Sequence, residues 1–255
     1  MARIVAVANQ KGGVGKTTTV INLAAYLAEF GRRVLVVDVD PQGNATTGLG
    51  IEKNEVETSA YDVLLGGATV GQAVVATETP GLHVLPATLD LAGAEVELIG
   101  EPEREFRLRA ALTPVRDRYD YLFIDCPPSL GLLTINALTA ADGVLIPIQC
   151  EFFALEGLSQ LMNTIDLVRR RLNPVLHLDG AVLTMFDGRT NLSTQVAAEV
   201  RRYLGEQVFA VAVPRTVRLS EAPSYGQPIS RYDPRSKAAE VYRQIAEEVL
   251  RRAAQ

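Results

Sequence analysis

Short apolar runs rich in β-branched residues alternate along the chain with longer segments whose apolar positions recur at helical spacing. Several of the short runs are continuously apolar, which is typical of parallel strands covered on both faces. Strands are predicted at residues 4–8, 34–38, 82–85, 121–125, 143–147 and 180–184, with a weaker one at 208–213. Helices are predicted at residues 16–30, 103–119, 134–141, 156–172, 192–204 and 236–252. This alternation predicts an α/β fold, a doubly wound, mostly parallel sheet with helices on both faces.

Residues 48–98 are less regular and richer in glycine and threonine, and we interpret them as a surface excursion from the sheet. The chain shows no internal repeat, low-complexity tract or linker. A length of 255 residues suits one large α/β domain or two small ones. The unbroken pattern favours a single domain over residues 1–255.

Composition narrows the class of protein. A hydrophobic fraction of 47% is enough for a substantial core and excludes a disordered or fibrous chain. The net charge of −5 weighs against bulk affinity for nucleic acid, although a basic patch can exist on an acidic protein. Two cysteines, Cys126 and Cys150, make no disulfide framework in a chain of this length, and we interpret them as buried, reduced thiols.

The chain opens on a strand-like run, without the charged segment, apolar stretch and cleavage site of a signal peptide. No stretch reaches the roughly 18 uninterrupted apolar residues of a membrane span. We therefore expect a soluble, cytoplasmic protein with no membrane partner.

A glycine-rich loop joins the first predicted strand to the first predicted helix. It reads Lys11-Gly12-Gly13-Val14-Gly15-Lys16-Thr17-Thr18. The glycines allow a tight turn that aims successive N–H groups at phosphate oxygens, and the helix adds the positive end of its dipole. Lys16 would reach the terminal phosphates, and the Thr17 hydroxyl would ligate Mg²⁺. The loop predicts that the chain binds a nucleoside triphosphate, ATP in the first instance, and hydrolyses it.

The loop departs from the ordinary phosphate-binding pattern at its start. The position five residues before Gly15, where that pattern has glycine, is Gln10, and a second lysine, Lys11, follows it. Lys11 does not repeat the task of Lys16 in the same site. We expect it to project outward, toward a second nucleotide held by a partner chain.

Three aspartates follow predicted strands. Asp38 and Asp40 end one strand, and Asp125 ends another. Because ligands of open α/β sheets bind at the carboxyl ends of the strands, these side chains should face the loop. Asp125 suits contact with Mg²⁺, directly or through water, Asp40 suits positioning of the attacking water beside the metal, and Asp38 suits a supporting role.

Together these motifs resemble the deviant-Walker P-loop ATPases, and the chain looks most like their ParA/Soj branch, which segregates bacterial chromosomes and plasmids. The resemblance runs from about residue 3 to residue 250. It rests on the loop, on Asp38-Val39-Asp40-Pro41-Gln42-Gly43-Asn44, on Ile124-Asp125-Cys126-Pro127-Pro128-Ser129, and on the segments 149–157, 183–190 and 214–223. The segments after residue 149 are the ones most specific to chromosomal Soj-like proteins.

The resemblance implies a nucleotide-dependent homodimer in which ATP lies between two subunits. Lys11 of each subunit would reach the nucleotide of the other and neutralise charge on its phosphates, as an arginine finger does. Asp40 would assist hydrolysis, which is slow without a partner. Pro214 and the backbone near Thr216 would border the adenine.

The resemblance also implies DNA binding without sequence preference and a ParB/Spo0J-like partner that stimulates hydrolysis. The expected carriers are Arg189 and Arg218, with Arg215 and the helical Arg201 and Arg202 as further candidates, and their contacts to phosphate would make the affinity fall with salt. The acidic net charge of the chain is compatible with DNA binding if two weakly basic faces join in one dimer. Such a protein would be cytoplasmic and associated with the nucleoid.

Three other interpretations stay open at the level of sequence. A membrane-recruited positioning ATPase of the MinD type would share the loop and use a C-terminal amphipathic helix for lipid. Residues 237–252 are amphipathic, but packing on the sheet is the simpler use for their apolar face. A metabolic ligase or a metal-site ATPase would need a second substrate site or paired thiols, which the sequence does not show. A switch that binds ATP with little turnover differs from the main interpretation only in degree.

Overall fold

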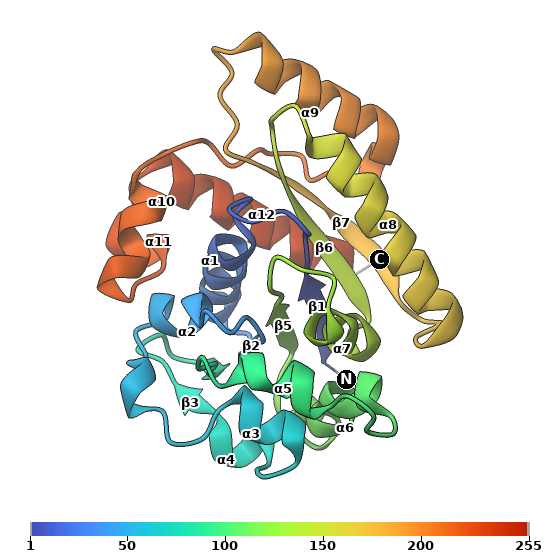
Figure 1. Cartoon of the computed structure of the whole chain (residues 1–255). Coiled ribbons are helices and arrows are strands. Elements are labelled where there is room, and N and C mark those ends of the chain that lie inside the picture. The colour runs from blue at the N-terminus through green and yellow to red at the C-terminus, as the bar shows by residue number, and fades with distance from the viewer. Residues whose placement is uncertain (1, 254–255) are drawn as a thin grey trace.

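The strands form one sheet in the order β3-β4-β2-β5-β1-β6-β7, in a computed structural model that describes residues 2–253 (Figure 1). Their bounds are β1 (Arg3–Val7), β2 (Val34–Asp38), β3 (Val75–Ala76), β4 (Leu82–Leu85), β5 (Tyr121–Asp125), β6 (Gly143–Gln149) and β7 (His177–Thr184). All neighbours pair in parallel except β3 with β4, which is an antiparallel pair at one edge. The predicted doubly wound, mostly parallel sheet is confirmed.

Helices cover both faces of this sheet (Figure 1). Their bounds are α1 (Lys16–Glu29), α2 (Asn44–Gly48), α3 (Ala60–Leu65), α4 (Val70–Ala73), α5 (Leu91–Glu97), α6 (Arg107–Leu112), α7 (Leu132–Ala140), α8 (Ala154–Arg171), α9 (Asn191–Leu204), α10 (Arg218–Glu221), α11 (Ile229–Tyr232) and α12 (Lys237–Ala253). Alternate residues of each strand serve the two faces, because side chains project to opposite sides of a strand. Val5 and Val7 pack with α1 and α12, whereas Ile4 and Ala6 pack in the layer of α3 and α5 to α9.

Two predicted elements are wrong. Residues 208–213 run beside β7 but form only isolated bridges, Ala181 with Val208 and Phe186 with Pro214. Phe209 and Val213 donate their N–H groups to the Ala181 and Leu183 carbonyls of β7, but the chain bends at residues 210 and 211 between them, and Pro214 offers no N–H to continue a ladder. The predicted helix 103–119 divides into α6 and two flanking 3₁₀ turns, Arg104–Phe106 and Thr113–Arg118, because Pro114 interrupts the helical hydrogen bonds.

Residues 48–98 are not a surface excursion. They supply β3 and β4 to the sheet and α3, α4 and α5 to one of its layers. Val63, Leu64, Leu91 and Ala94 from these helices are buried in the core cluster on that face. The sequence does not reveal these helices because they are only four to seven residues long, which is too short for a clear 3.6-residue period of apolar positions.

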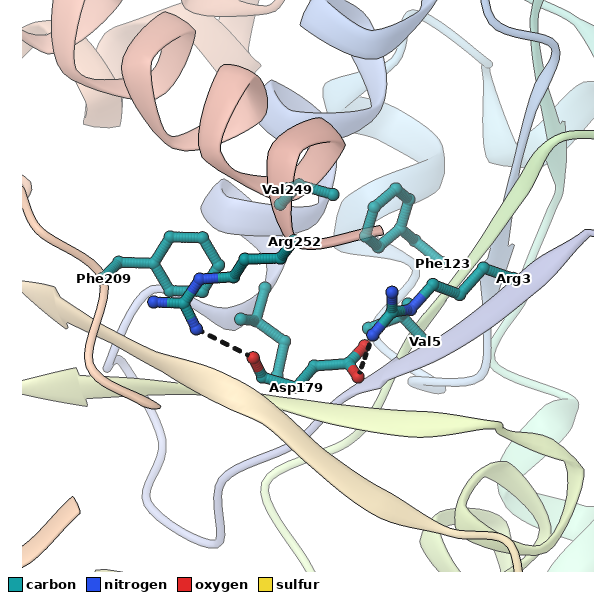
Figure 2. A pocket seen from close by; sticks show the side chains of 8 residues that line it. Arg3, Val5, Phe123, Asp179, Phe209, Val249 and Arg252 are labelled. Atoms are coloured by element: carbon teal, nitrogen blue, oxygen red, sulfur yellow. Dashed lines mark hydrogen bonds and ion pairs between the residues drawn. The ribbon is translucent and has the colours of Figure 1, made fainter. Parts of the chain in front are cut away.

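Hydrogen bonds of Arg252 hold the last helix, α12, against the amino-terminal half of the strands (Figure 2). Arg252 of α12 donates to the carbonyls of Asp179, Glu206, Gln207 and Val208, to the carboxylate of Glu248, and stacks 4.2 Å above the centre of the Phe209 ring. Beside it, the carboxylate of Asp179 accepts a 2.6 Å hydrogen bond from Arg3 of β1 (Figure 2). The charged side chains that line this small pocket therefore already have partners within the protein, and the pocket offers no free charged group to a ligand.

Candidate nucleotide site

The glycine-rich loop lies where the carboxyl ends of the central strands meet. It leaves β1, which pairs with β5 on one side and β6 on the other. In the register of the sheet, Asp125 at the end of β5 faces Val7 on one neighbouring strand and Asp38 on the other. The parallel pairing therefore brings the loop and the two strand ends that carry the three aspartates to one edge, as the sequence predicts.

Backbone conformation explains two of the loop glycines. Gly13 has φ +74° and Gly15 has φ +92°, a left-handed region that side chains with a Cβ rarely adopt. Gly15 occupies the cap position of α1, so the chain turns there directly into the helix. The first N–H groups of α1 have no helical acceptor and are available to an anion.

Two polar side chains that the sequence did not single out fasten the loop to the sheet. Asn9 donates a 2.7 Å hydrogen bond to the Pro147 carbonyl of β6 and accepts one from the Lys11 N–H. Thr184, the last residue of β7, donates a 2.7 Å bond to the Val14 carbonyl. A buried asparagine directly after the first strand was a usable signal in the sequence, whereas nothing there connected Thr184 to a loop 170 residues earlier.

Lys16 is buried at the head of α1, with 6% of its surface exposed. Its ammonium donates a 3.2 Å hydrogen bond to the Lys11 carbonyl across the loop. Burial lowers the pKa of this ammonium, and the nearby carboxylates of Asp125 and Asp40 act in the opposite direction. A cation held away from water by its own loop is prepared for an anion that enters the loop.

Asp125 is a buried carboxyl group without partners. It is fully buried, and neither of its oxygens accepts a hydrogen bond from residues 2–253. Burial raises its pKa well above the ordinary value, and the neighbouring Asp38 raises it further; the Thr17 hydroxyl, which is close by but outside hydrogen-bond geometry, and the Lys16 ammonium act against them. Such a group is costly unless a ligand completes it, and carboxylate oxygen is the donor that Mg²⁺ prefers.

These residues fit a metal that also binds a nucleotide. Residues 2–253 hold no group of three or more His, Cys, Asp or Glu side chains arranged for a metal ion. Mg²⁺ in nucleotide sites is held by one or two protein oxygens, with phosphate and water completing its shell. Asp125 and Thr17 would be those ligands, and no dedicated cage is required.

The other two aspartates of this edge have different surroundings. Asp38 is fully buried and accepts hydrogen bonds from the N–H and hydroxyl of Thr46 and from the N–H of Asp40. Burial raises its pKa to about 6, against the effect of these hydrogen bonds. Its oxygens are thus used in holding the turn after β2. This supporting position is the one expected from the sequence.

Asp40 lies at that turn and is 7% exposed. One of its carboxylate oxygens accepts the N–H of Gln42 at 3.0 Å, and its carbonyl accepts the N–H of Gly43. These contacts fix the backbone of the turn, and the second carboxylate oxygen has no hydrogen-bond partner among residues 2–253. Asp40 therefore has capacity to hold a water molecule.

Lys11 does not point into its own loop. Its ammonium pairs with the Glu151 carboxylate, which follows β6, and 41% of the Lys11 side chain is exposed. Exposed Phe152 and Phe153 come next in the chain, with ring centres 5.1 Å apart. The outward direction expected for Lys11 agrees with this position, and the pairing with Glu151 was not foreseen.

A pocket beside the loop is suited to a base. Gly15 and Thr18 of the loop and α1 line one side of it, and Pro214 and Thr216 line the other. Met185, with φ +50°, and Tyr242 complete the wall. The structure thus brings the residues expected at the adenine next to those expected at the phosphates. Arg215, which the resemblance offered for DNA, also lines this pocket.

Of the arginines expected to contact DNA, Arg189 lies in an exposed turn after β7, and Arg218 is the exposed first residue of α10. Arg189 has 89% of its side chain exposed and pairs with Asp187, and Arg218 pairs with Glu221 and Asp233. Arg202 of α9 pairs with Glu199 in the same manner. Each of these guanidinium groups is at the surface, and each has an acidic neighbour that a phosphate would have to displace.

The cysteines do not take part in chemistry at this edge. Both are buried, and burial raises the pKa of each thiol, that of Cys150 to about 11. The predicted buried, reduced thiols are confirmed. A thiol with a raised pKa is a poor nucleophile and a poor metal ligand.

Comparison with known proteins places the chain in a family. Residues 2–178 match the family model described as an AAA domain. The sporulation initiation inhibitor protein Soj of Bacillus subtilis is 59% identical over 249 residues, covering 98% of both chains. The chromosome partitioning protein ParA of Myxococcus xanthus is 58% identical over 252 residues, covering 99% of this chain and 89% of the relative. The chain belongs to the ParA/Soj family of chromosome-partitioning P-loop ATPases.

A solved structure agrees with the fold of this ParA/Soj-family chain. A crystal structure named cobyrinic acid a,c-diamide synthase, from Mycobacterium smegmatis, is 43% identical, has a TM-score of 0.88, and covers 100% of this chain and 96% of its own. It holds ADP and magnesium, and another crystal of that protein holds an ATP analogue and magnesium. The shared fold extends over the whole ParA/Soj-family chain.

The apolar face of the last helix bears on the MinD-type alternative. Val241 and Ile245 of α12 are buried, 4% and 0% exposed, in the cluster that also holds α1. The expected packing of this face is confirmed, so it is not free for lipid. Within the described part of this ParA/Soj-family chain, no helix combines the length and apolar character needed to cross a membrane.

Proposed function

We propose that this chain binds ATP with Mg²⁺ at the carboxyl edge of the sheet and hydrolyses it to ADP and phosphate. The observation that carries the proposal is the buried carboxyl group of Asp125, without a partner, next to the buried ammonium of Lys16 and the glycine turn. Opposite charges that are both withdrawn from water, and are not paired with each other, are complementary to a metal–phosphate group.

Each residue of the site has a distinct task in this proposal. The N–H groups at the start of α1 and the Lys16 ammonium bind the phosphates, while Pro214 and Thr216 border the base. Mg²⁺, held at Asp125 and Thr17, would neutralise phosphate charge. Asp40 orients the water that attacks the terminal phosphorus, and the bond from that phosphorus to the bridging oxygen of ADP breaks.

Lys11 supports a nucleotide-dependent homodimer. It leaves its own loop for the surface, so its charge is placed to act on a nucleotide in a second copy of the chain. To do so it must leave Glu151. This exchange would couple ATP binding to the pairing of two subunits. The terminal phosphate of the ATP bound to the other subunit would compete with the Glu151 carboxylate for the Lys11 ammonium.

DNA binding by that dimer, and stimulation of hydrolysis by a ParB/Spo0J-like protein, complete the proposed cycle. The exposed guanidinium groups of Arg189 and Arg218 support the first. Each is weak alone, and two copies in one dimer gain by acting together. The protein would then associate with the nucleoid in the cytoplasm and help to segregate DNA.

Retention of the protein on DNA-coated beads, with ATP or with ADP, tests the proposal. We expect retention with ATP only, a steep decrease with salt, and a decrease of at least fivefold in Arg189→Ala and Arg218→Ala. Arg170→Ala, at an exposed position on α8, is the matched control and should bind as the wild type does. Equal retention with ATP and ADP would sink the proposed cycle.

A further inference from the structure

The short helix α5 is apolar on two sides. Its inward side chains, Leu91, Ala94 and Leu98, are buried in the core. A second apolar row faces solvent, at spacings of three and four residues that place its members on one side of a helix. This outer row consists of Ala92 and Val96 within α5, Leu89 in the turn before it and Ile99 in the turn after it, and the three larger side chains are 70%, 68% and 68% exposed. A short helix with apolar rows on two sides has more apolar surface than its own core contact can bury.

The surroundings of this outer row are acidic. No Lys or Arg occurs from residue 54 to residue 103, so all 25 of them lie elsewhere in the chain, while nine of the 30 Asp and Glu lie in this stretch. Asp90, Glu97, Glu101 and Glu103 are exposed next to the outer row. Within residues 2–253, Asp90 and Glu103 form no ion pair. A nucleic acid or an anionic membrane would be repelled here, and a basic segment would be attracted.

The outer row is joined to the turn that carries Asp40 through Ala87, just before the row begins. The Ala87 N–H donates a 2.9 Å hydrogen bond to the hydroxyl of Thr46, and that hydroxyl donates to Asp38. On the other side of Ala87, its carbonyl lies against Gly43, where a Cβ would approach within 2.8 Å. Gly43 has φ +59° and closes the turn that begins at Asp40.

We propose that the outer row of α5 is a docking surface for a basic amphipathic helix of a partner protein, and that docking adjusts the Asp40 turn through Ala87 and Thr46. Within this row Ala92, Val96 and Ile99 have the i, i+4 and i+7 spacing of one helix face, which suits packing against the apolar face of a second helix. The helix α5 belongs to the layer on the face of the sheet opposite α1 and α12, and it lies beside the label of α6 in the lower half of Figure 1. A second copy is a poor occupant by symmetric contact of two α5 faces, because both are acidic.

This inference rests on the proposed function, since it gives a surface through which a partner would stimulate hydrolysis. The binding test uses a fluorescent 14-residue synthetic peptide with leucine at heptad positions and lysine elsewhere, added to the full chain with ATP. We expect the double variant Val96→Ser with Ile99→Ser to weaken binding at least tenfold, because it removes two apolar anchors. Val175→Ser, at a position that is also 68% exposed but precedes β7, should change binding less than twofold.

A peptide with glutamate in place of lysine should not bind. Equal affinities in the double variant and in Val175→Ser, or equal binding of the acidic peptide, would overturn the proposal. So would loss of the ATP-dependent dimer in the double variant without peptide, because the face would then belong to a second copy.

The coupling to Asp40 has its own measurement. With bound peptide, wild-type hydrolysis of ATP should rise severalfold, Thr46→Ser should keep that rise, and Thr46→Val should bind the peptide equally but lose it. A rise that persists in Thr46→Val would overturn the coupling. Basal hydrolysis and ATP-dependent DNA retention, measured without peptide, report on the proposed function separately, so a wild-type chain that lacks both but binds the peptide would refute that function and not the docking surface.

Discussion

The two edges of the central sheet carry the same residue type in opposite circumstances. At the amino edge, Asp120, Asp142 and Asp179 each pair with an arginine, namely Arg33, Arg116 and Arg3. At the carboxyl edge, Asp38, Asp40 and Asp125 pair with none among residues 2–253. In the described part of the chain, the oxygens of Asp125 do not accept a hydrogen bond either.

This difference separates structure from function. A paired carboxylate contributes to stability and has no remaining capacity for a ligand. A buried carboxylate without a partner destabilises the ligand-free protein by about 1–3 kcal/mol or more, and the ligand that completes it recovers that energy as affinity. The amino edge should therefore govern stability, and the carboxyl edge should govern binding and catalysis.

The largest expected effect is on hydrolysis at the carboxyl edge. Asp125→Asn keeps the shape of the side chain and removes the charge that would hold Mg²⁺. We expect the rate of ATP hydrolysis to fall at least 100-fold, because phosphoryl transfer depends on a correctly held metal ion. Phosphate release at saturating ATP measures it. A rate within threefold of wild type would remove Asp125 from the site.

The next effect is on stability at the amino edge. Arg252→Ala deletes the guanidinium that joins α12 to four carbonyls and to Glu248, and it leaves these acceptors to find water. We expect the free energy of unfolding to fall by about 2–4 kcal/mol, measured by urea denaturation, with the rate of hydrolysis per folded molecule unchanged. Arg251→Ala is the matched control at the adjacent exposed position and should stay within about 0.5 kcal/mol of wild type.

The pH dependence of the ligand-free protein distinguishes the edges further. Because folding raises the pKa values of Asp38 and Asp125, the folded chain holds more protons there than the unfolded chain. Their contribution to stability is present below about pH 4 and is lost as pH rises through the folded pKa, which is about 6 for Asp38 and is raised well above the ordinary carboxyl value for Asp125. In EDTA, stability should fall by a few kcal/mol at most between pH 5 and pH 8. A flat or rising profile in wild type would contradict the burial of these two charges.

The smallest effect concerns the pairing of Lys11 with Glu151. Glu151→Gln removes the competitor for Lys11 in the monomer. Both side chains are about one third exposed or more, so the gain is modest, and we expect the ATP-dependent dimer to form two- to fivefold more readily. Sedimentation at several protein concentrations measures this. Weaker dimerisation in Glu151→Gln would show that Glu151 supports the dimer rather than competing with it.

The sequence predicts the features that depend on neighbouring residues and misses those that depend on contacts between distant residues. Continuous apolar runs predicted β2, β4 and β5 with the bounds observed, and the glycine-rich loop between β1 and α1 predicted the nucleotide site. Both patterns lie within a few consecutive residues, so they can be recognised in the sequence. The contacts that complete the site are not local. Thr184 meets the loop across 170 residues, and Glu151 meets Lys11 from another strand end.

The errors have a related physical cause. Residues 208–213 have the composition of a strand, but the chain bends at residues 210 and 211, where the Ala210 N–H donates to the Glu248 carboxylate of α12. Residues 48–98 form helices too short for a clear period, although their apolar side chains are buried. In both regions tertiary contacts, rather than local preference, decide the backbone.

Thermal melting of wild type and Asp125→Asn, each in EDTA and with Mg²⁺ and ATP, tests the central claim most directly. If the buried carboxylate is kept for a ligand, Asp125→Asn should melt at the wild-type temperature or above it in EDTA, and it should lose most of the rise that Mg²⁺ and ATP give the wild type. An Asp125→Asn variant that melts several degrees below wild type in EDTA, and still gains the full rise with Mg²⁺ and ATP, would show that Asp125 is a structural residue and would contradict the account.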